Sequence, residues 1–159
     1  DAIAALSALA NCDCAEREPA LDRFYARWKA EPLVVDKWLA VQAMSRVPST
    51  LDNVKRLAAH PAFDIRNPNK VYSLIRAFCG NFARFNAADG RGYAFAADKV
   101  IEIDPLNPQV AARVARAFDR WKKFGAGRQP HARAALERIR DAQGLSPDVA
   151  EIVGKALSG

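Results

Sequence analysis

The chain has 159 residues, enough for one domain with a sizeable core, and half of its residues are apolar, which excludes an intrinsically disordered protein. No run of about 18 apolar residues marks a membrane-spanning helix. The net charge of +6 fits either a nucleic-acid partner or an acidic partner domain. Basic residues are spread over most of the chain, which favours the partner domain.

Apolar residues follow a helical period from one end of the chain to the other. They recur at three- and four-residue spacings, which place them on one face of a helix. These stripes cover residues 21–28, 34–41, 51–58, 71–79, 110–121, 132–139 and 149–156. Residues 93–103 are apolar nearly all round, which predicts the most buried helix. No segment keeps the two-residue period of a strand for long enough, so the sequence predicts an all-α fold.

Helix boundaries are marked by cap residues and prolines. Three caps stand directly before a proline: Asn67-Pro68, Asn107-Pro108 and Ser146-Pro147. Proline suits the first helical position, because the N–H that it lacks would have no helical partner there. Ser49 with Asp52 resembles a capping box. The pattern predicts about eight or nine helices of about 10–17 residues in antiparallel pairs, and leaves open whether they form a bundle or a solenoid.

The cysteines predict a reducing environment. Cys12, Cys14 and Cys79 are an odd number without the spacing of a disulfide framework, which favours reduced thiols and a cytoplasmic location. The alternative for Cys12-Asp13-Cys14 is a redox or soft-metal pair.

Catalytic motifs are missing from the sequence. The only histidines are His60 and His131, and neither belongs to an HExxH motif, whereas a zinc site needs three protein ligands. We expect both to be structural, with His60 at a helix end where a partial positive charge suits the dipole. No Gly-x-Ser-x-Gly elbow or phosphate-binding loop is found either. The sequence predicts no catalytic residue and no metal site in this chain.

Three segments carry a resemblance to a known family: HPAFDIRNPNK at 60–70, FNAADGRGYAF at 85–95 and NPQVAARV at 107–114. They are similar to the extreme C-terminal domain of bacterial aminopeptidase N, a zinc-dependent gluzincin. That family binds zinc through HExxH and a downstream Glu, and recognises the substrate N-terminus through a GAMEN-like loop; neither motif is in this sequence. The resemblance implies that residues 1–159 are one non-catalytic helical domain of a larger enzyme, with zinc held elsewhere in the parent. The chain opens at Asp1 and has Met44 as its only methionine, which predicts an excised or processed fragment.

The resemblance also implies an architecture and a role. It favours a right-handed α-superhelix of the armadillo/HEAT type, which caps the catalytic domain and lines the chamber through which peptides reach the zinc. The expected partners are the other domains of a cytoplasmic parent and the peptide substrate, with no nucleic acid and no membrane. The alternative is an independent α-solenoid adaptor for a protein or peptide, marked by an exposed face that stays apolar once the core is assigned. A nucleic-acid binder is a further rival, with a steeply salt-dependent affinity.

A stripe of basic residues after Pro108 is the candidate site. It comprises Arg113, Arg116, Arg120 and Lys123, at intervals of three, four and three residues. Cationic side chains on a chamber wall could hold a peptide C-terminal carboxylate by paired hydrogen bonds. The simpler interpretation is a solvated helix face.

Two further observations refine this hypothesis. Arg113 falls within NPQVAARV and is the first choice, while Asn69, in the first turn after Pro68, is the remaining channel candidate. Phe118 and Trp121 belong to the apolar face rather than alternating with the charges, which argues against nucleic acid.

Overall fold

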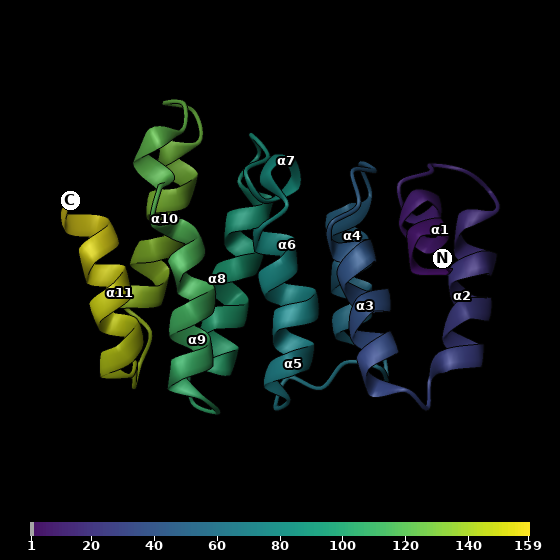
Figure 1. The fold of residues 1–159 in the computed structure, drawn as a ribbon. Helices are drawn as coiled ribbons and strands as arrows, with labels where there is room; N and C mark the ends of the chain where they lie inside the picture. The colour runs from purple at the N-terminus through teal and green to yellow at the C-terminus, as the bar shows by residue number, and fades with distance from the viewer. Residues whose placement is uncertain (1) are drawn as a thin grey trace. The chain divides into compact units, whose positions relative to one another are not determined.

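Helices make up the regular structure of the computed structural model, which describes residues 2–159 (Figure 1). The chain divides into two compact units, one ending at Arg84 and the other covering Phe85–Gly159. The described residues form no strand, so the all-α prediction is confirmed.

The first unit is built around one central helix. Its elements are α1 (Ala2–Ala10), α2 (Arg17–Trp28), α3 (Pro32–Ala43), α4 (Thr50–Ala58), α5 (Pro68–Val71), the π-helical segment η1 (Tyr72–Arg76) and α6 (Ala77–Cys79). The helix α3 packs against α1, α2, α4 and η1. Its buried Trp38 donates a hydrogen bond from Nε1 to the Leu21 carbonyl at 3.0 Å, which joins α3 to α2. The short α7 (Phe82–Phe85) spans the boundary between the units.

The second unit contains α8 (Arg91–Ile103), α9 (Pro108–Ala115), two 3-10 turns, η2 (Arg116–Phe118) and η3 (Trp121–Lys123), then α10 (Gln129–Arg140) and α11 (Pro147–Ser158). The helices α8 and α11 each pack against both α9 and α10. Phe85, Tyr93 and Phe118 form a cluster of rings whose centroids lie 5.1 to 6.0 Å apart. Tyr93 and Ile103 of α8 are almost fully buried, but Ala94, Asp98 and Glu102 are exposed along one side, so α8 is not apolar nearly all round as expected.

Local signals in the sequence set several helix starts. The side chains of Asn67, Asn107 and Ser146 each accept a hydrogen bond from a backbone N–H of the first turn, as predicted. Asp104, buried at the end of α8, accepts hydrogen bonds from the Ser146 backbone N–H at 2.8 Å and from its hydroxyl at 2.5 Å. The start of α11 is therefore held both by its own cap and by a carboxylate from α8.

Three expectations are corrected. Ser49 makes no side-chain cap; its hydroxyl accepts a hydrogen bond from Asn53 Nδ2 at 3.2 Å instead. The helix after Pro108 ends at Ala115 and gives way to two 3-10 turns, in which Phe118 and Trp121 are still buried. Cys12 and Cys14 are joined in a disulfide, so they are not the reduced thiols that we expected.

Candidate functional site

Two of the candidate arginines, Arg113 and Arg116, lie on an open groove between α9 and α11. The groove has a volume of about 530 Å³ and is lined by Gln109, Ala112, Arg113, Arg116, Pro147, Asp148, Glu151 and Ile152. Asn107 and Ser146 cap the two helices, so both walls start at fixed positions. One wall is basic and the other acidic.

A charged residue on each wall of the groove is paired with a neighbouring side chain of opposite charge. Lys155 Nζ lies 2.8 Å from Glu151 Oε1, and this hydrogen bond, together with the charges of Lys155 and Arg116, lowers the pKa of Glu151 below its ordinary value. On the other wall, Arg116 Nη1 lies 3.7 Å from Asp119 Oδ2. Because these side chains are exposed, the ion pairs contribute little to stability. The groove therefore carries solvent-exposed basic and acidic side chains on facing walls.

The structure separates the four candidate residues. Arg113 and Arg116 share the groove, which is the part of the stripe that the fold brings together. Arg120 is exposed between the two 3-10 turns and is not among the groove residues, because the α-helical register ends at Ala115. Asn69 is exposed on α5 in the first unit, where its backbone N–H donates to Asn67 Oδ1 at 3.0 Å.

Sequence reasoning missed the acidic wall of the groove. Asp148 and Glu151 are three residues apart near the start of α11, a spacing that places both on one face of the helix. Nothing in the local sequence predicts that this face lies against α9, about forty positions earlier in the chain. Only the packing of α9 against α11 brings the two faces together.

The first unit holds a smaller pocket around His60. It has a volume of about 80 Å³ and is lined by Glu18, Leu21, Asp22, Trp38, Gln42, Arg56, Leu57 and His60. The His60 ring meets Tyr25 edge-on at 4.8 Å between centroids, and its Nδ1 accepts a hydrogen bond from the Ala62 N–H at 2.9 Å. Burial lowers the pKa of His60, opposed by the charge of Asp22. The lowered pKa favours the uncharged imidazole at neutral pH, in which Nδ1 can accept the Ala62 N–H.

Potential metal ligands are scattered over residues 2–159. Within that range, no three His, Cys, Asp or Glu side chains gather so that they could hold a metal ion. None of the helices in the same range has the length and apolar character needed to cross a membrane.

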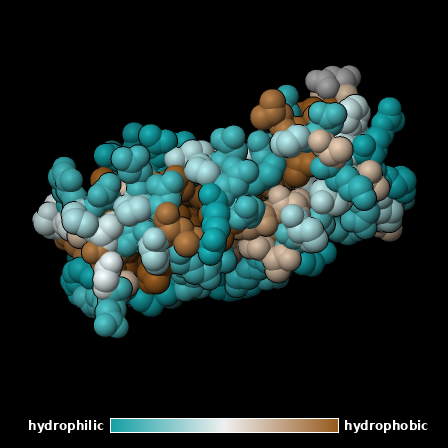
Figure 2. Space-filling model, turned by 90° about the horizontal axis from the view of Figure 1, so that it is seen from below, coloured by the Kyte–Doolittle hydropathy of each residue, from teal (hydrophilic) through white to brown (hydrophobic). Residues whose placement is uncertain are grey.

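Exposed apolar side chains are few among the described residues. The large ones are Leu33, Met44, Phe82 and Leu106. On the face drawn in Figure 2, hydrophobic residues show as separate patches within a mostly hydrophilic surface. That face lacks the continuous apolar surface that would mark an independent adaptor.

The chain is similar in sequence to a known domain family and to bacterial aminopeptidases. Residues 1–158 match a family described as "Domain of unknown function (DUF3458_C) ARM repeats". Aminopeptidase N of Caulobacter vibrioides is 42% identical over 142 residues, which cover 89% of this chain and 16% of that protein. Aminopeptidase N of Escherichia coli K12 is 40% identical over 159 residues, which cover 99% of this chain and 18% of that protein. The chain thus spans less than a fifth of the length of these relatives.

A solved structure shares the fold. The crystal structure of Legionella pneumophila aminopeptidase A in complex with aspartic acid matches with a TM-score of 0.91 and 35% identity, over 98% of this chain and 18% of that chain. The resemblance to the C-terminal domain of bacterial aminopeptidase N and the α-solenoid fold class are both confirmed. The chain belongs to the DUF3458_C family of ARM-repeat domains, the family represented in the C-terminal region of bacterial aminopeptidase N.

Proposed function

We propose that this chain serves a zinc-dependent aminopeptidase N as a non-catalytic domain that docks on the catalytic domain and lines the passage by which peptides reach the zinc. The parent enzyme would remove single residues from peptide N-termini in the cytoplasm. Zinc would be held outside this chain, because the chain has no HExxH motif and its described residues offer no ligand set.

The observation that carries this proposal is the extent of the homology. The similarity runs along nearly the whole chain, while the same alignments cover only 16–18% of the relatives. A domain that accompanies the enzyme but lacks its metal-binding motif is expected to act through binding and access rather than through chemistry.

The groove between α9 and α11 supplies a means of contact with substrate. A peptide carries a carboxylate at its C-terminus, and Arg113 and Arg116 offer guanidinium groups that can bind it with two hydrogen bonds. Asp148 and Glu151 on the facing wall reduce the positive potential of the groove. The groove would therefore attract a peptide carboxylate only weakly and would mainly orient the bound peptide. Amide and cationic groups of the same peptide could contact the acidic wall.

The test is Arg113→Ala in the full-length enzyme, with Arg120→Ala as the matched control. Arg120 is an exposed arginine outside the groove. Arg113→Ala should raise KM for peptides more than KM for a small aminoacyl arylamide, which has no C-terminal carboxylate. A sheltered charge-assisted contact is worth about 1.5–3 kcal/mol, a ratio of about tenfold or more, whereas solvent access would reduce it toward about 0–1 kcal/mol. Arg120→Ala should leave the ratio unchanged.

Two outcomes would contradict this role. If both variants changed the two substrates equally, Arg113 would be an ordinary solvated charge. If only Arg120→Ala changed the ratio, the passage would be lined by another surface of the domain.

A further inference from the structure

The turn between α1 and α2 carries two cysteines that the proposed function does not use. Cys12 and Cys14 are paired in a disulfide across Asp13, and both are half-buried rather than enclosed. A thiol reagent of small size can therefore reach this pair. The third cysteine, Cys79 on α6, is free and buried.

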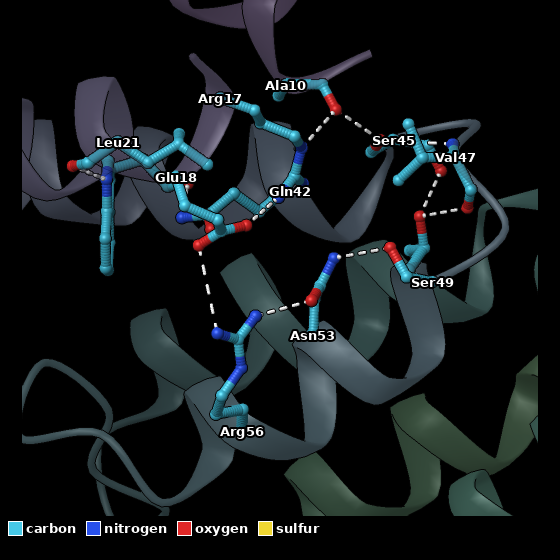
Figure 3. Close-up of polar contacts among 12 residues, drawn as sticks. Ala10, Arg17, Glu18, Leu21, Gln42, Ser45, Val47, Ser49, Asn53 and Arg56 are labelled. Carbon is cyan, nitrogen blue, oxygen red and sulfur yellow. Dashed lines mark hydrogen bonds and ion pairs between the residues drawn. The ribbon is translucent and has the colours of Figure 1, made fainter. Parts of the chain in front are cut away.

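Strong local contacts fix the residue that precedes the turn. The carbonyl oxygen of Ala10, the last residue of α1, accepts two hydrogen bonds: from Arg17 Nε at 3.0 Å and from Ser45 Oγ at 2.6 Å (Figure 3). Arg17 begins α2, and Ser45 follows α3. One carbonyl thus joins α1 to both neighbouring helices.

The turn itself is held at both ends. Asn11 Oδ1 accepts a hydrogen bond from the Arg46 backbone N–H at 2.8 Å, and the Cys14 carbonyl accepts one from the Arg17 backbone N–H at 3.2 Å. The disulfide lies between these two contacts in the sequence. It therefore restrains the short segment that connects them.

Arg17 gives the closed turn an energetic cost. Its side chain is almost fully buried, and although Nη1 reaches Glu18, no described group accepts a hydrogen bond from Nη2. A buried donor without an acceptor is unfavourable relative to the same donor in water. Opening of the turn would hydrate Nη2, so the hydrogen bonds and the disulfide of the turn must offset this cost.

We propose that Cys12 and Cys14 form a reversible thiol–disulfide switch that locks the α1–α2 turn when oxidised and loosens it when reduced. The co-reactant class is a small thiol and its disulfide, such as glutathione. One thiolate attacks a protein sulfur and forms a mixed disulfide, and the other cysteine leaves as a thiolate that takes up a proton. A second thiolate then attacks the mixed disulfide, so two thiols are oxidised to one small disulfide for each protein disulfide reduced.

Cys79 serves as an internal reference. Burial raises its pKa to about 12, which leaves almost no thiolate at neutral pH. It should not react while the chain is folded, so alkylation of the native protein reports on Cys12 and Cys14 alone.

The experiment equilibrates the 159-residue chain in buffers of varied glutathione to glutathione disulfide ratio, alkylates it with N-ethylmaleimide and measures the mass. The native protein should carry either no label or two labels, with the population shifting between them as the ratio changes. Backbone amide exchange should be faster by about tenfold or more in the reduced form at residues 11–17 and at Arg46, but unchanged around Phe78.

The control is the double variant Cys12→Ser/Cys14→Ser, whose exchange should match that of the reduced chain and should not respond to glutathione. Singly labelled species that outnumber both the unlabelled and the doubly labelled chain at every glutathione ratio would overturn the proposal, because the two cysteines would then not pair with each other. Exchange rates that stay equal in the oxidised and reduced chain would overturn it too, since the bond would lock nothing.

Discussion

The imidazole of His131, at the start of α10, lies directly against the backbone of Gly90, the residue before α8. A Cβ built on Gly90 would come within 2.6 Å of His131 Cβ and Nδ1, and Gly90 has φ of 78°. Glycine is therefore required at this position for two reasons: the backbone is left-handed, and the His131 ring leaves no room for a Cβ atom. The contact is one of several by which α8 and α10 approach each other.

Gly90→Ala should destabilise the chain by more than the backbone effect alone. The left-handed conformation costs a non-glycine residue about 1–2 kcal/mol, and displacement of the His131 ring adds to that. The free energy of unfolding in urea measures the loss. The matched control is Gly144→Ala, because Gly144 has φ of 74° but no atom within 4 Å of its Cβ position. If both substitutions lowered the free energy of unfolding equally, the His131 ring would move aside without measurable cost.

Phe78→Ala should lower the free energy of unfolding by about 3–5 kcal/mol, the range for truncating a buried phenylalanine. Phe78 lies on α6 and is fully buried. Phe82→Ala is the control, since that ring is 69% exposed and its loss should cost about 0.5 kcal/mol or less. A loss under about 1 kcal/mol for Phe78→Ala would mean that the stripe over residues 71–79 is not core.

Stability should fall as the pH is lowered through the range below the ordinary His60 pKa of 6.5. The folded state lowers the pKa of His60, so the unfolded chain binds more protons in this range and acid favours unfolding. The stabilising contribution is complete above pH 6.5 and is lost as the pH approaches the folded pKa. His60→Asn keeps a hydrogen-bond acceptor for the Ala62 N–H but cannot titrate, so urea unfolding should depend less on pH in this variant. An unchanged pH profile would contradict the argument.

The isolated chain should not hydrolyse aminoacyl arylamides, with or without added zinc. Its two histidines are far apart in sequence, and its described residues offer no cluster of three metal ligands. The measurement is release of the arylamine at high protein concentration. Metal-dependent turnover that co-purified with the chain through two unrelated columns would overturn the assignment as a non-catalytic domain.

The sequence by itself determined the helical class and many of the helix starts. The caps at Asn67, Asn107 and Ser146 act within their own first turn, so their effect does not depend on the rest of the fold. The stripe at 71–79 likewise predicts burial at Leu74, Ile75 and Phe78, because its spacing puts these side chains on one face. The family resemblance rests on contiguous segments and is also a property of the sequence.

The tertiary structure decided everything that depends on partners distant in the chain. The π-helical segment at Tyr72–Arg76 and the end of α9 at Ala115 depart from the α-helical register that local spacing predicts. The acidic wall facing Arg113 exists only because α11 packs on α9. The pKa of His60 is lowered because α2 and α3 supply the rings, Tyr25 and Trp38, that partly bury it. Helix propensity and caps act over three or four residues, whereas grooves, burial and shifted pKa values arise from side chains that only the folded chain brings together.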